Sequence, residues 1–167
     1  MTVALRILLI APAAGLAWML AASQLVDQTR LPIDVVVEGA VMTQPFGCTT
    51  LALEPFDPLC PGRHVHTGVD LAARAGTPVH SATSGVARVG YDPAGAGLYV
   101  AVKFGYNVRV LYCHLFTAAV KSGESVEPGE VIGAVGSSGL ATGPHVHFEV
   151  QVDGRSVDPV EWLASPS

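Results

Sequence analysis

The chain has 167 residues, half of them apolar, and 9 Lys and Arg against 14 Asp and Glu give it a formal net charge of -5. This length suits one domain with a hydrophobic core and a short appendage, and it argues against a second independent domain. Proteins that bind nucleic acid gather Lys and Arg against the phosphates, so the acidic balance argues against a nucleic-acid partner. The 18 Gly and 12 Pro, with only 7% aromatic residues, favour short strands joined by turns over long helices.

The N-terminal part of the chain has a different character. Residues 7–26 carry no charged side chain, and this run is long enough to cross most of a bilayer. Positive charge at Arg6 and the amino terminus favours an orientation with the rest of the chain outside. The small residues at 21–23 fit a cleavage site, so a removed signal peptide and a retained anchor both stay open. We therefore expect residues 1–30 to be a signal peptide or membrane anchor plus a short linker, and residues 31–167 to form the domain.

This assignment also predicts where the protein acts. We expect export to an extracytoplasmic place, the periplasm or the cell surface, with the inner membrane as a partner if the N-terminal helix is retained as an anchor.

After this segment, the pattern is one of short β-branched runs bounded by Gly and Pro. In chain order they predict strands at residues 33–37, 41–47, 78–79, 85–89, 98–103 and 108–114, two within 123–136, and one over 145–150. The reversal at 104–107 is short enough for residues 99–103 and 108–114 to pair as a hairpin. Helical windows occur only at residues 115–120 and 159–164.

The fold class follows from this pattern. The spacing of Gly and Val at residues 76–90 recurs loosely at residues 123–136, which hints at a duplicated strand-turn-strand unit. We predict a mainly β fold, a compact antiparallel β-sheet domain preceded by an N-terminal hydrophobic helix.

The three cysteines fall into two groups. Cys48 and Cys60 flank a segment without clear periodicity, and export makes a disulfide between them possible. Such a bridge would pin a loop that has little core of its own, whereas the alternative is two buried apolar thiols. Cys113 alternates with Tyr112 and His114 on a predicted strand, so we expect it to face away from both and to be a core residue rather than a nucleophile.

The residues with the most chemistry lie in the strand at 145–150. Alternation along a strand sends successive side chains to opposite faces. One face would carry His145, His147 and Glu149, and the other Val146, Phe148 and Val150. A lone His-x-His is a weak signal, but two further histidine segments precede it, at residues 66–70 and 112–115.

Together these segments can supply a metal site. Zinc in hydrolytic sites takes three His or carboxylate ligands and leaves a position for water. His66, Asp70 and His147 can provide that set, because the glycine between the first two predicts a turn that brings Asp70 back to His66. His114 and His145 then become candidates for accepting a proton and for stabilising a tetrahedral intermediate.

Five segments resemble, in order, the lysostaphin/LytM-type zinc metallopeptidases that cut peptidoglycan peptides. They are His-Thr-Gly-Val-Asp-Leu (66–71), Gly-Thr-Pro-Val (76–79), Leu-Tyr-Cys-His-Leu (111–115), Val-Glu-Pro-Gly-Glu-Val-Ile-Gly-Ala-Val-Gly-Ser-Ser-Gly (126–139) and Thr-Gly-Pro-His-Val-His-Phe-Glu-Val (142–150). The resemblance covers about residues 41–163. It implies a LytM-like, duplicated-hybrid-motif fold: a compact antiparallel β core with a groove on one sheet.

The resemblance also implies an activity and a division of roles. One Zn²⁺ per domain would be held by His66, Asp70 and His147, while His114 and His145 would be catalytic. The substrate would be peptidoglycan peptides, either stem-peptide cross-links or bridges, and we expect a monomer.

Other histidines and one carboxylate leave alternatives open. His64 forms a second His-x-His with His66, and spacing alone does not say which is the ligand, although the following Gly-x-Asp-Leu favours His66. Glu149 could be a hydrogen-bond partner of His147 or a solvent-exposed carboxylate. His80 is interpreted as structural.

Two other functions compete with this one. A degenerate relative would bind cell wall or activate another hydrolase, but such a protein would be expected to lack a ligand, and none is missing here. A lipoyl- or biotinyl-type carrier would display a lysine on a hairpin tip, and no lysine follows Lys121.

Overall fold

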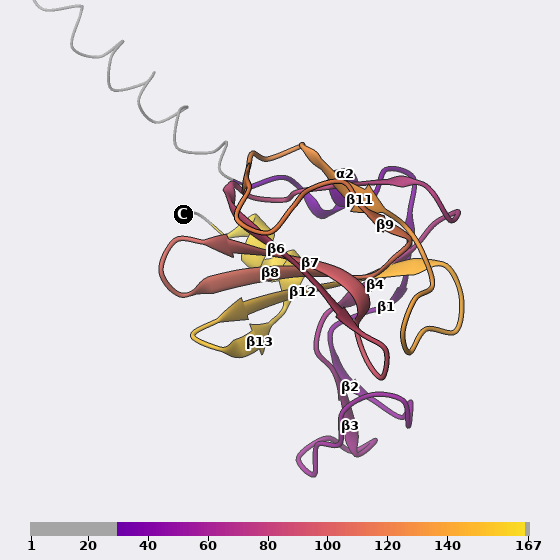
Figure 1. Cartoon of the computed structure of the whole chain (residues 1–167). Coiled ribbons are helices and arrows are strands. Elements are labelled where there is room, and N and C mark those ends of the chain that lie inside the picture. Colours follow the sequence, from indigo (N-terminus) through magenta and orange to yellow (C-terminus); the bar gives the residue numbers. More distant parts are fainter. Residues whose placement is uncertain (1–29, 166–167) are drawn as a thin grey trace, which may run out of the picture.

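The computed structural model describes residues 30–165, which form antiparallel strands and two short helices (Figure 1). The strands are β1 (Val41–Gln44), β2 (Gly47–Thr49), β3 (His64–His66), β4 (Val69–Ala72), β5 (Pro78–His80), β6 (Gly85–Asp92), β7 (Gly97–Phe104), β8 (Val108–Leu115), β9 (Thr117–Ala118), β10 (Ser125–Val126), β11 (Val131–Ala134), β12 (His145–Val152) and β13 (Arg155–Val157). The helices are α2 (Ile33–Val36) and α3 (Pro159–Ala164). The predicted mainly β, antiparallel fold is confirmed.

The predicted N-terminal hydrophobic helix and its role as signal or anchor lie outside the described residues. Within residues 30–165, neither helix has the length and apolar character that crossing a membrane requires.

One large sheet organises the domain. Its strand order is β1-β4-β12-β8-β7-β6-β10, with β13 paired to β12. A smaller sheet has the order β5-β11-β9, and β2 pairs with β3 in a separate hairpin. Because β12 lies between β4 and β8, the strand with the His-x-His sequence sits in the middle of the large sheet and receives neighbours from both sides.

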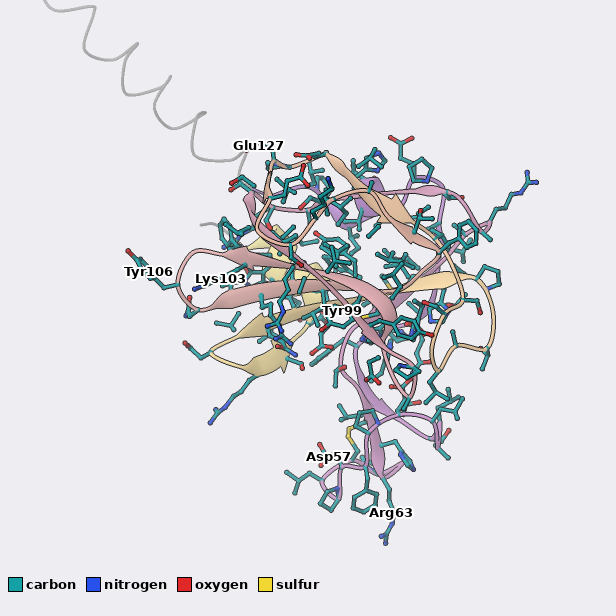
Figure 2. The ribbon with its side chains drawn as sticks, viewed as in Figure 1. Asp57, Arg63, Tyr99, Lys103, Tyr106 and Glu127 are labelled. Carbon is teal, nitrogen blue, oxygen red and sulfur yellow. A yellow bond between two sulfur atoms is a disulfide. The ribbon has the colours of Figure 1, made fainter. Side chains whose placement is uncertain are left out.

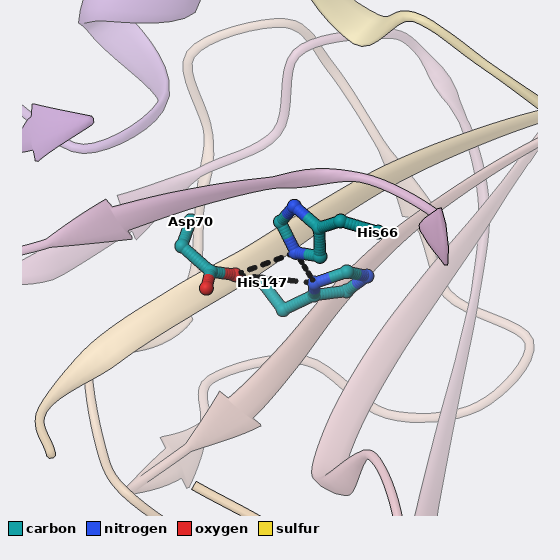
Figure 3. Close-up of side chains that lie close together, drawn as sticks. All are labelled: His66, Asp70 and His147. Carbon is teal, nitrogen blue, oxygen red and sulfur yellow. Dashed lines mark hydrogen bonds and ion pairs between the residues drawn. The ribbon is translucent and has the colours of Figure 1, made fainter. Parts of the chain in front are cut away.

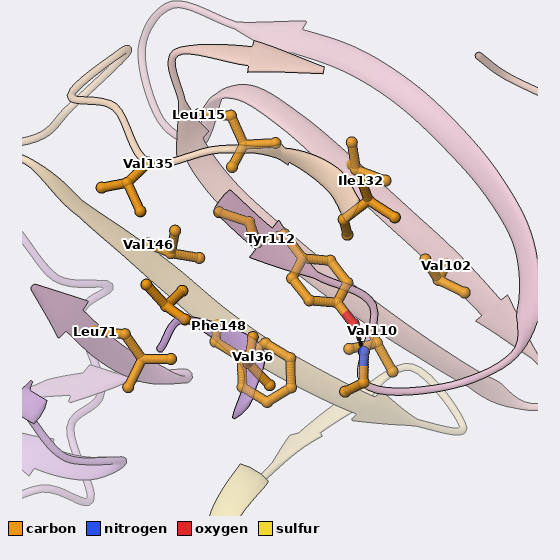
Figure 4. Close-up of a cluster of buried hydrophobic side chains, with 14 of the residues drawn as sticks. Val36, Leu71, Val102, Val110, Tyr112, Leu115, Ile132, Val135, Val146 and Phe148 are labelled. Atoms are coloured by element: carbon orange, nitrogen blue, oxygen red, sulfur yellow. Dashed lines mark hydrogen bonds between the residues drawn. The ribbon is translucent and has the colours of Figure 1, made fainter. Parts of the chain in front are cut away.

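The core lies on one face of the large sheet. Val146, Phe148 and Val150 are fully buried there, so the predicted alternation of β12 is confirmed. The Phe148 ring packs against Tyr112 of β8 with 5.3 Å between ring centroids (Figure 4). The Tyr112 hydroxyl accepts a 2.7 Å hydrogen bond from the backbone N–H of Ala82, which satisfies a polar group that would otherwise be buried without a partner.

Two predicted elements are wrong. Residues 33–37, predicted as a strand, form the short helix α2, because burial of Val36 and Val37 in the core can be met by a helical turn as well as by a strand. Residues 115–120, predicted as helical, finish β8 and form β9, whose backbone pairs with β11. In both segments tertiary contacts decided the conformation over local preference.

Other predictions hold. The β7–β8 hairpin forms through the reversal after Phe104. Helix α3 begins after Asp158, whose carboxylate accepts from the N–H groups of Val160 and Glu161. A side chain that accepts these first amide hydrogens is the usual N-terminal cap of a helix.

A disulfide-pinned lobe, residues 47–66, projects from the large sheet (Figure 1). It contains the β2–β3 hairpin and the predicted Cys48–Cys60 disulfide, which is confirmed. Its apolar side chains face solvent: Leu51, Leu53, Phe56 and Leu59 are all exposed. The lobe therefore has little hydrophobic core and is held by the disulfide and by backbone hydrogen bonds.

Candidate metal centre

Sheet register places the candidate ligands. His147 of β12 pairs directly with Asp70 of β4, and His66 ends the strand just before the turn into β4. Gly68 sits in that turn against β12, where an added Cβ would lie 2.4 Å from the Phe148 carbonyl oxygen and 2.9 Å from His147 Nε2. A side chain there would push β3 away from β12, so glycine is what allows the close approach.

The three side chains converge on one point (Figure 3). His66 Nε2 and His147 Nδ1 each lie 3.2 Å from Asp70 Oδ1, and the two nitrogens are 2.9 Å apart. The three candidate ligand atoms all lie within 4.8 Å of one another. The structure thus brings together the three residues predicted as metal ligands.

Each of the two histidines uses its other nitrogen on the protein. His66 Nδ1–H donates to the Pro45 carbonyl oxygen at 2.9 Å, which leaves Nε2 with its lone pair toward the cluster. His147 Nε2 lies 3.5 Å from Glu149 Oε2. Metal-binding histidines commonly hold their outer nitrogen on a carbonyl or carboxylate in this way. The donor set and its orientation therefore fit a metal ion.

Glu149 is a buried partner of His147 rather than an exposed carboxylate. Its Oε1 accepts from Gln151 Nε2 at 2.6 Å and from Ser156 Oγ at 2.7 Å, and its Oε2 accepts from Thr67 Oγ1 at 3.2 Å. Burial alone would raise the pKa of Glu149, but the hydrogen bonds from His147, Ser156 and Gln151 outweigh it and lower the pKa to about 2. The carboxylate stays charged beside His147 at neutral pH.

The same balance governs Asp70 and His147. Burial alone would raise the pKa of Asp70, yet its hydrogen bonds with His147 and His66 hold the pKa well below the usual range. Burial alone would lower the pKa of His147, but the carboxylates of Asp70 and Glu149 raise it. The cluster therefore attracts positive charge, and a metal cation would take the place of the proton on His147.

His145 and His114 lie beside this cluster. His145 Nε2 is 3.7 Å from Asp70 Oδ1, and its ring centroid is 4.7 Å from that of His114. His145 Nδ1–H donates to the Gly143 carbonyl, and His114 Nδ1–H donates to the Ser138 carbonyl, both at 2.8 Å. Because carbonyl oxygens only accept, both rings carry a hydrogen on Nδ1, so each Nε2 accepts when its ring is neutral and donates when its ring is protonated.

His114 has an unusual backbone, with a φ of 62°. Its N–H donates to the Ala96 carbonyl and its own carbonyl accepts from the N–H of Ser138, so neighbouring loops hold this conformation. Burial lowers the pKa of His114, and the positive charges of the nearby histidines lower it further. The ring is therefore neutral at physiological pH, as a proton acceptor must be.

The remaining histidines lie outside the cluster. His64 Nδ1–H donates to the Glu54 carbonyl at 2.8 Å, and its ring packs edge-on against Phe56 in the disulfide-pinned lobe. Of the two histidines His64 and His66, only His66 reaches Asp70 and His147. His80 lies in β5 of the small sheet.

Cys113 is buried, but not in the main core. It faces away from Tyr112, as predicted, and packs with Ala101 and Leu111 on the groove side of the large sheet, opposite His147. It was also expected to face away from His114, but both residues line the same groove, because the positive φ of His114 breaks the alternation of the strand. Burial, together with the nearby charge of Glu149, raises the pKa of Cys113 to about 12. The thiol is therefore protonated and unsuited to act as a nucleophile.

A groove of about 440 Å³ runs over the cluster. Its floor carries His114, His145 and His147. One wall is the disulfide-pinned lobe and the other is formed by residues 94–96 with Leu140 and Thr142. Sequence analysis missed the lobe as a wall, and it missed Thr67, Gln151 and Ser156 around Glu149, because these contacts join distant parts of the chain.

Comparison with known proteins agrees with this site. Residues 64–159 match Peptidase family M23. The chain is 43% identical over 96 residues to the DD-carboxypeptidase/endopeptidase Mpg of Neisseria meningitidis, covering 58% of this chain and 22% of that protein. The chain spans about a fifth of the length of the curated relatives it matches.

Two solved structures share the fold. The catalytic domain of the prophage-encoded M23 protein EnpA from Enterococcus faecalis, crystallised as a point mutant, is 32% identical with a TM-score of 0.62, covering 73% of this chain and 90% of that one. A zinc-containing peptidase from Vibrio cholerae is 33% identical with a TM-score of 0.65, covering 80% of this chain and 39% of that one.

Proposed function

The chain belongs to Peptidase family M23, and from this premise we propose that it is a zinc-dependent endopeptidase that hydrolyses peptide bonds of peptidoglycan. The observation that carries the proposal is the convergence of His66, Asp70 and His147 on the floor of an open groove, with two further histidines beside them. A relative from Vibrio cholerae named peptidoglycan DD-endopeptidase ShyA, 38% identical over 96 residues that cover 58% of this chain and 22% of that protein, supports a cell-wall peptide as substrate.

Zinc is the metal that this donor set favours. Two imidazole nitrogens and one carboxylate oxygen, with no thiolate, are typical of a catalytic zinc site with an open position. His66 Nε2, His147 Nδ1 and Asp70 Oδ1 would hold one ion per domain. When bound, zinc supplies Lewis-acid chemistry: it polarises a carbonyl and makes a water molecule more acidic.

His114 and His145 would handle the proton and the developing charge. The neutral ring of His114, fixed through Nδ1 on Ser138, would accept a proton at Nε2 from the attacking water. His145, held through Nδ1 on Gly143, would in its protonated form donate from Nε2 to the oxygen of the scissile carbonyl and stabilise the charge that develops there.

We further propose that residues 31–167 act outside the cytoplasm, with residues 1–30 as a signal peptide or an inner-membrane anchor. The uncharged run at residues 7–26 supports this, and so does the Cys48–Cys60 disulfide, because disulfides persist in oxidising compartments. The substrate bond would be a stem-peptide cross-link or a bridge, and the active form would be a monomer.

The test is digestion of purified peptidoglycans of several chemotypes with the purified protein, with and without a chelator, followed by mass spectrometry of the products. We expect new peptide termini that disappear with chelator and return when zinc is added back. A protein with full zinc content that cleaves none of these peptidoglycans would contradict the proposal and favour a wall-binding or hydrolase-activating role.

A further inference from the structure

A cationic cluster lies on the same face of the large sheet as His147. Arg109 of β8 is directly opposite Lys103 of β7, and Arg88 of β6 is opposite Ala101, two residues from Lys103. Directly opposed side chains share a face and come within about 5 Å at Cβ, and diagonal neighbours lie about 7 to 8 Å apart. Three of the nine Lys and Arg of this acidic chain therefore sit together.

Among residues 30–165, no carboxylate forms an ion pair with this cluster. All three side chains are exposed, and every ion pair found within residues 30–165 involves a histidine. The carboxylates nearest along the sheet serve other groups, because Glu149 accepts from Gln151 and Ser156, and Asp153 accepts from Asn107. Like charges placed directly opposite each other destabilise a sheet. A local arrangement that costs stability without a compensating contact is the kind expected at a binding site.

The position of the cluster relates it to the candidate metal centre. Arg109 pairs with Gln151, which lies four residues beyond His147 on β12, so the separation along the strand is about 13 Å. Leu111 and Ala101 lie between the two sites, and Glu149, opposite Leu111, is held by Gln151 and Ser156. An extended peptide covers about 13 Å with roughly four residues. A peptide lying across the sheet could therefore meet both sites at once.

A shallow depression marks the far end of this path. It has a volume of about 420 Å³, and its lining includes Lys103, Arg109 and Gln151. In Figure 2, Lys103 and Tyr106 lie toward the loop end of the β7–β8 hairpin, while Arg63 lies away from them at the tip of the disulfide-pinned lobe. The depression thus continues the open face of the sheet past the groove.

We propose that the Arg88–Lys103–Arg109 cluster binds a carboxylate of the substrate peptide, about four residues from the bond held at the metal centre. The proposal rests on the proposed function. Arg109 and Arg88 offer planar guanidinium groups that bind carboxylates through two hydrogen bonds, and Lys103 adds a point charge. Stem peptides of peptidoglycan carry free carboxylates, and a path that passes Leu111, Ala101 and the charged Glu149 suits a peptide better than a polyphosphate.

The test compares two double variants of equal net charge in the zinc-loaded full chain. Lys103→Gln/Arg109→Gln removes the opposed pair, and Arg74→Gln/Lys121→Gln removes two exposed cations elsewhere. The substrates are a cross-linked muropeptide with free carboxylates and the same muropeptide with its carboxylates amidated. Binding of an uncleaved, single-stem muropeptide is measured in parallel by calorimetry, in both its free and its amidated form.

For the free-carboxylate substrate, we expect the cluster variant to raise KM about tenfold with kcat unchanged, as for loss of a charge-assisted hydrogen bond. It should leave KM for the amidated substrate unchanged, and the control variant should resemble wild type. The cluster variant should also melt at the same or a higher temperature, which a merely structural pair would not allow.

Three results would overturn the proposal: equal KM changes in both double variants, equal binding of free and amidated muropeptide by wild type, or a loss of binding confined to a phosphate-rich wall polymer. The calorimetric arm separates this inference from the proposed function. A chain that cleaves nothing but still loses carboxylate-dependent binding on Lys103→Gln/Arg109→Gln would sink the enzyme proposal and keep the cluster.

Discussion

The floor and the wall of the groove are built on different physical principles. On the floor, paired strands place His66, Asp70 and His147, and hydrogen bonds hold these side chains to one another and to the backbone. In the wall, the disulfide-pinned lobe has one short hairpin, one cross-link and a row of exposed apolar side chains. Sheet register fixes the floor, and a covalent bond helps to fix the wall. Substitutions on the floor should therefore abolish metal binding or lower kcat, whereas substitutions in the wall should change only KM.

The largest effect should follow from removing a ligand. His147→Ala deletes one of the three donor atoms and leaves Asp70 with only His66 of its two hydrogen-bonded histidines, so zinc content should fall from one ion per chain to near zero and hydrolysis should disappear. Metal analysis of the purified protein and peptidoglycan digestion measure the two losses. His80→Ala is the control, since this histidine lies in the small sheet away from the groove. Retention of one tightly bound zinc in His147→Ala would show that the ligand assignment is wrong.

The next effect should come from the proton acceptor. His114→Ala should keep zinc but lower kcat by roughly 10²- to 10⁴-fold, because a positioned general base contributes about that much. His114 has a φ of 62°, a conformation that Asn adopts more readily than Ala, so His114→Asn should show the same loss with less strain. Single-turnover rates and metal content are the readouts, with His64→Ala as the control.

If His114→Asn digests peptidoglycan at the normal rate, the proton-acceptor role is wrong. If instead both His114 variants lose zinc, His114 is part of the metal site, and its assignment as a proton acceptor separate from the ligands is wrong.

A smaller effect, on zinc affinity, should follow from changing Glu149, which contacts His147 but is not a candidate ligand. Glu149→Gln removes the charge that faces His147 Nε2 while keeping the shape, and loss of such a partner typically weakens metal binding by about 10- to 100-fold. A competition titration against a chelator of known affinity measures it. Glu54→Gln, on the lobe wall, should leave zinc affinity unchanged. Equal affinities of Glu149→Gln and wild type would mean that Glu149 serves only to hold Ser156 and Gln151.

The contrast between floor and wall also explains what could be predicted of the fold. The predictions of alternating faces along β12 and of the β7–β8 hairpin were correct, because a period of two and a short reversal are local signals in the sequence. Residues 33–37 and 115–120 were predicted wrongly, because a few apolar residues fit a helical turn or a strand equally well and tertiary contacts decide between them. Short segments at the edge of a core carry too little periodicity to decide.

In the candidate site, the sequence was enough to predict the candidate ligands, but not the groups that hydrogen-bond to them. Two signals were enough to predict the three residues that converge. They are the spacing of His66 and Asp70 across a glycine, and the resemblance of the segment around His147 to a family motif. The carbonyl of Pro45 and the side chains of Thr67 and Ser156 could not be predicted, because they reach the site only through the pairing of distant strands. The lobe was visible as a pinned loop, but its position over the groove depends on the same long-range packing.

The smallest effect on hydrolysis should come from opening the wall. Cys48→Ala/Cys60→Ala removes the cross-link but leaves β3 hydrogen-bonded to β2 and His66 on Pro45, so zinc content and kcat should be unchanged. KM should rise by roughly three- to tenfold, since the loosened lobe must be ordered again when substrate binds, at a cost in conformational entropy. Michaelis kinetics on a soluble cross-linked muropeptide measure this, with Cys113→Ala as the control for losing a buried sulfur. Loss of zinc in the double variant would mean that the disulfide also holds His66 in place, so that the lobe would be needed for metal binding as well as for substrate binding.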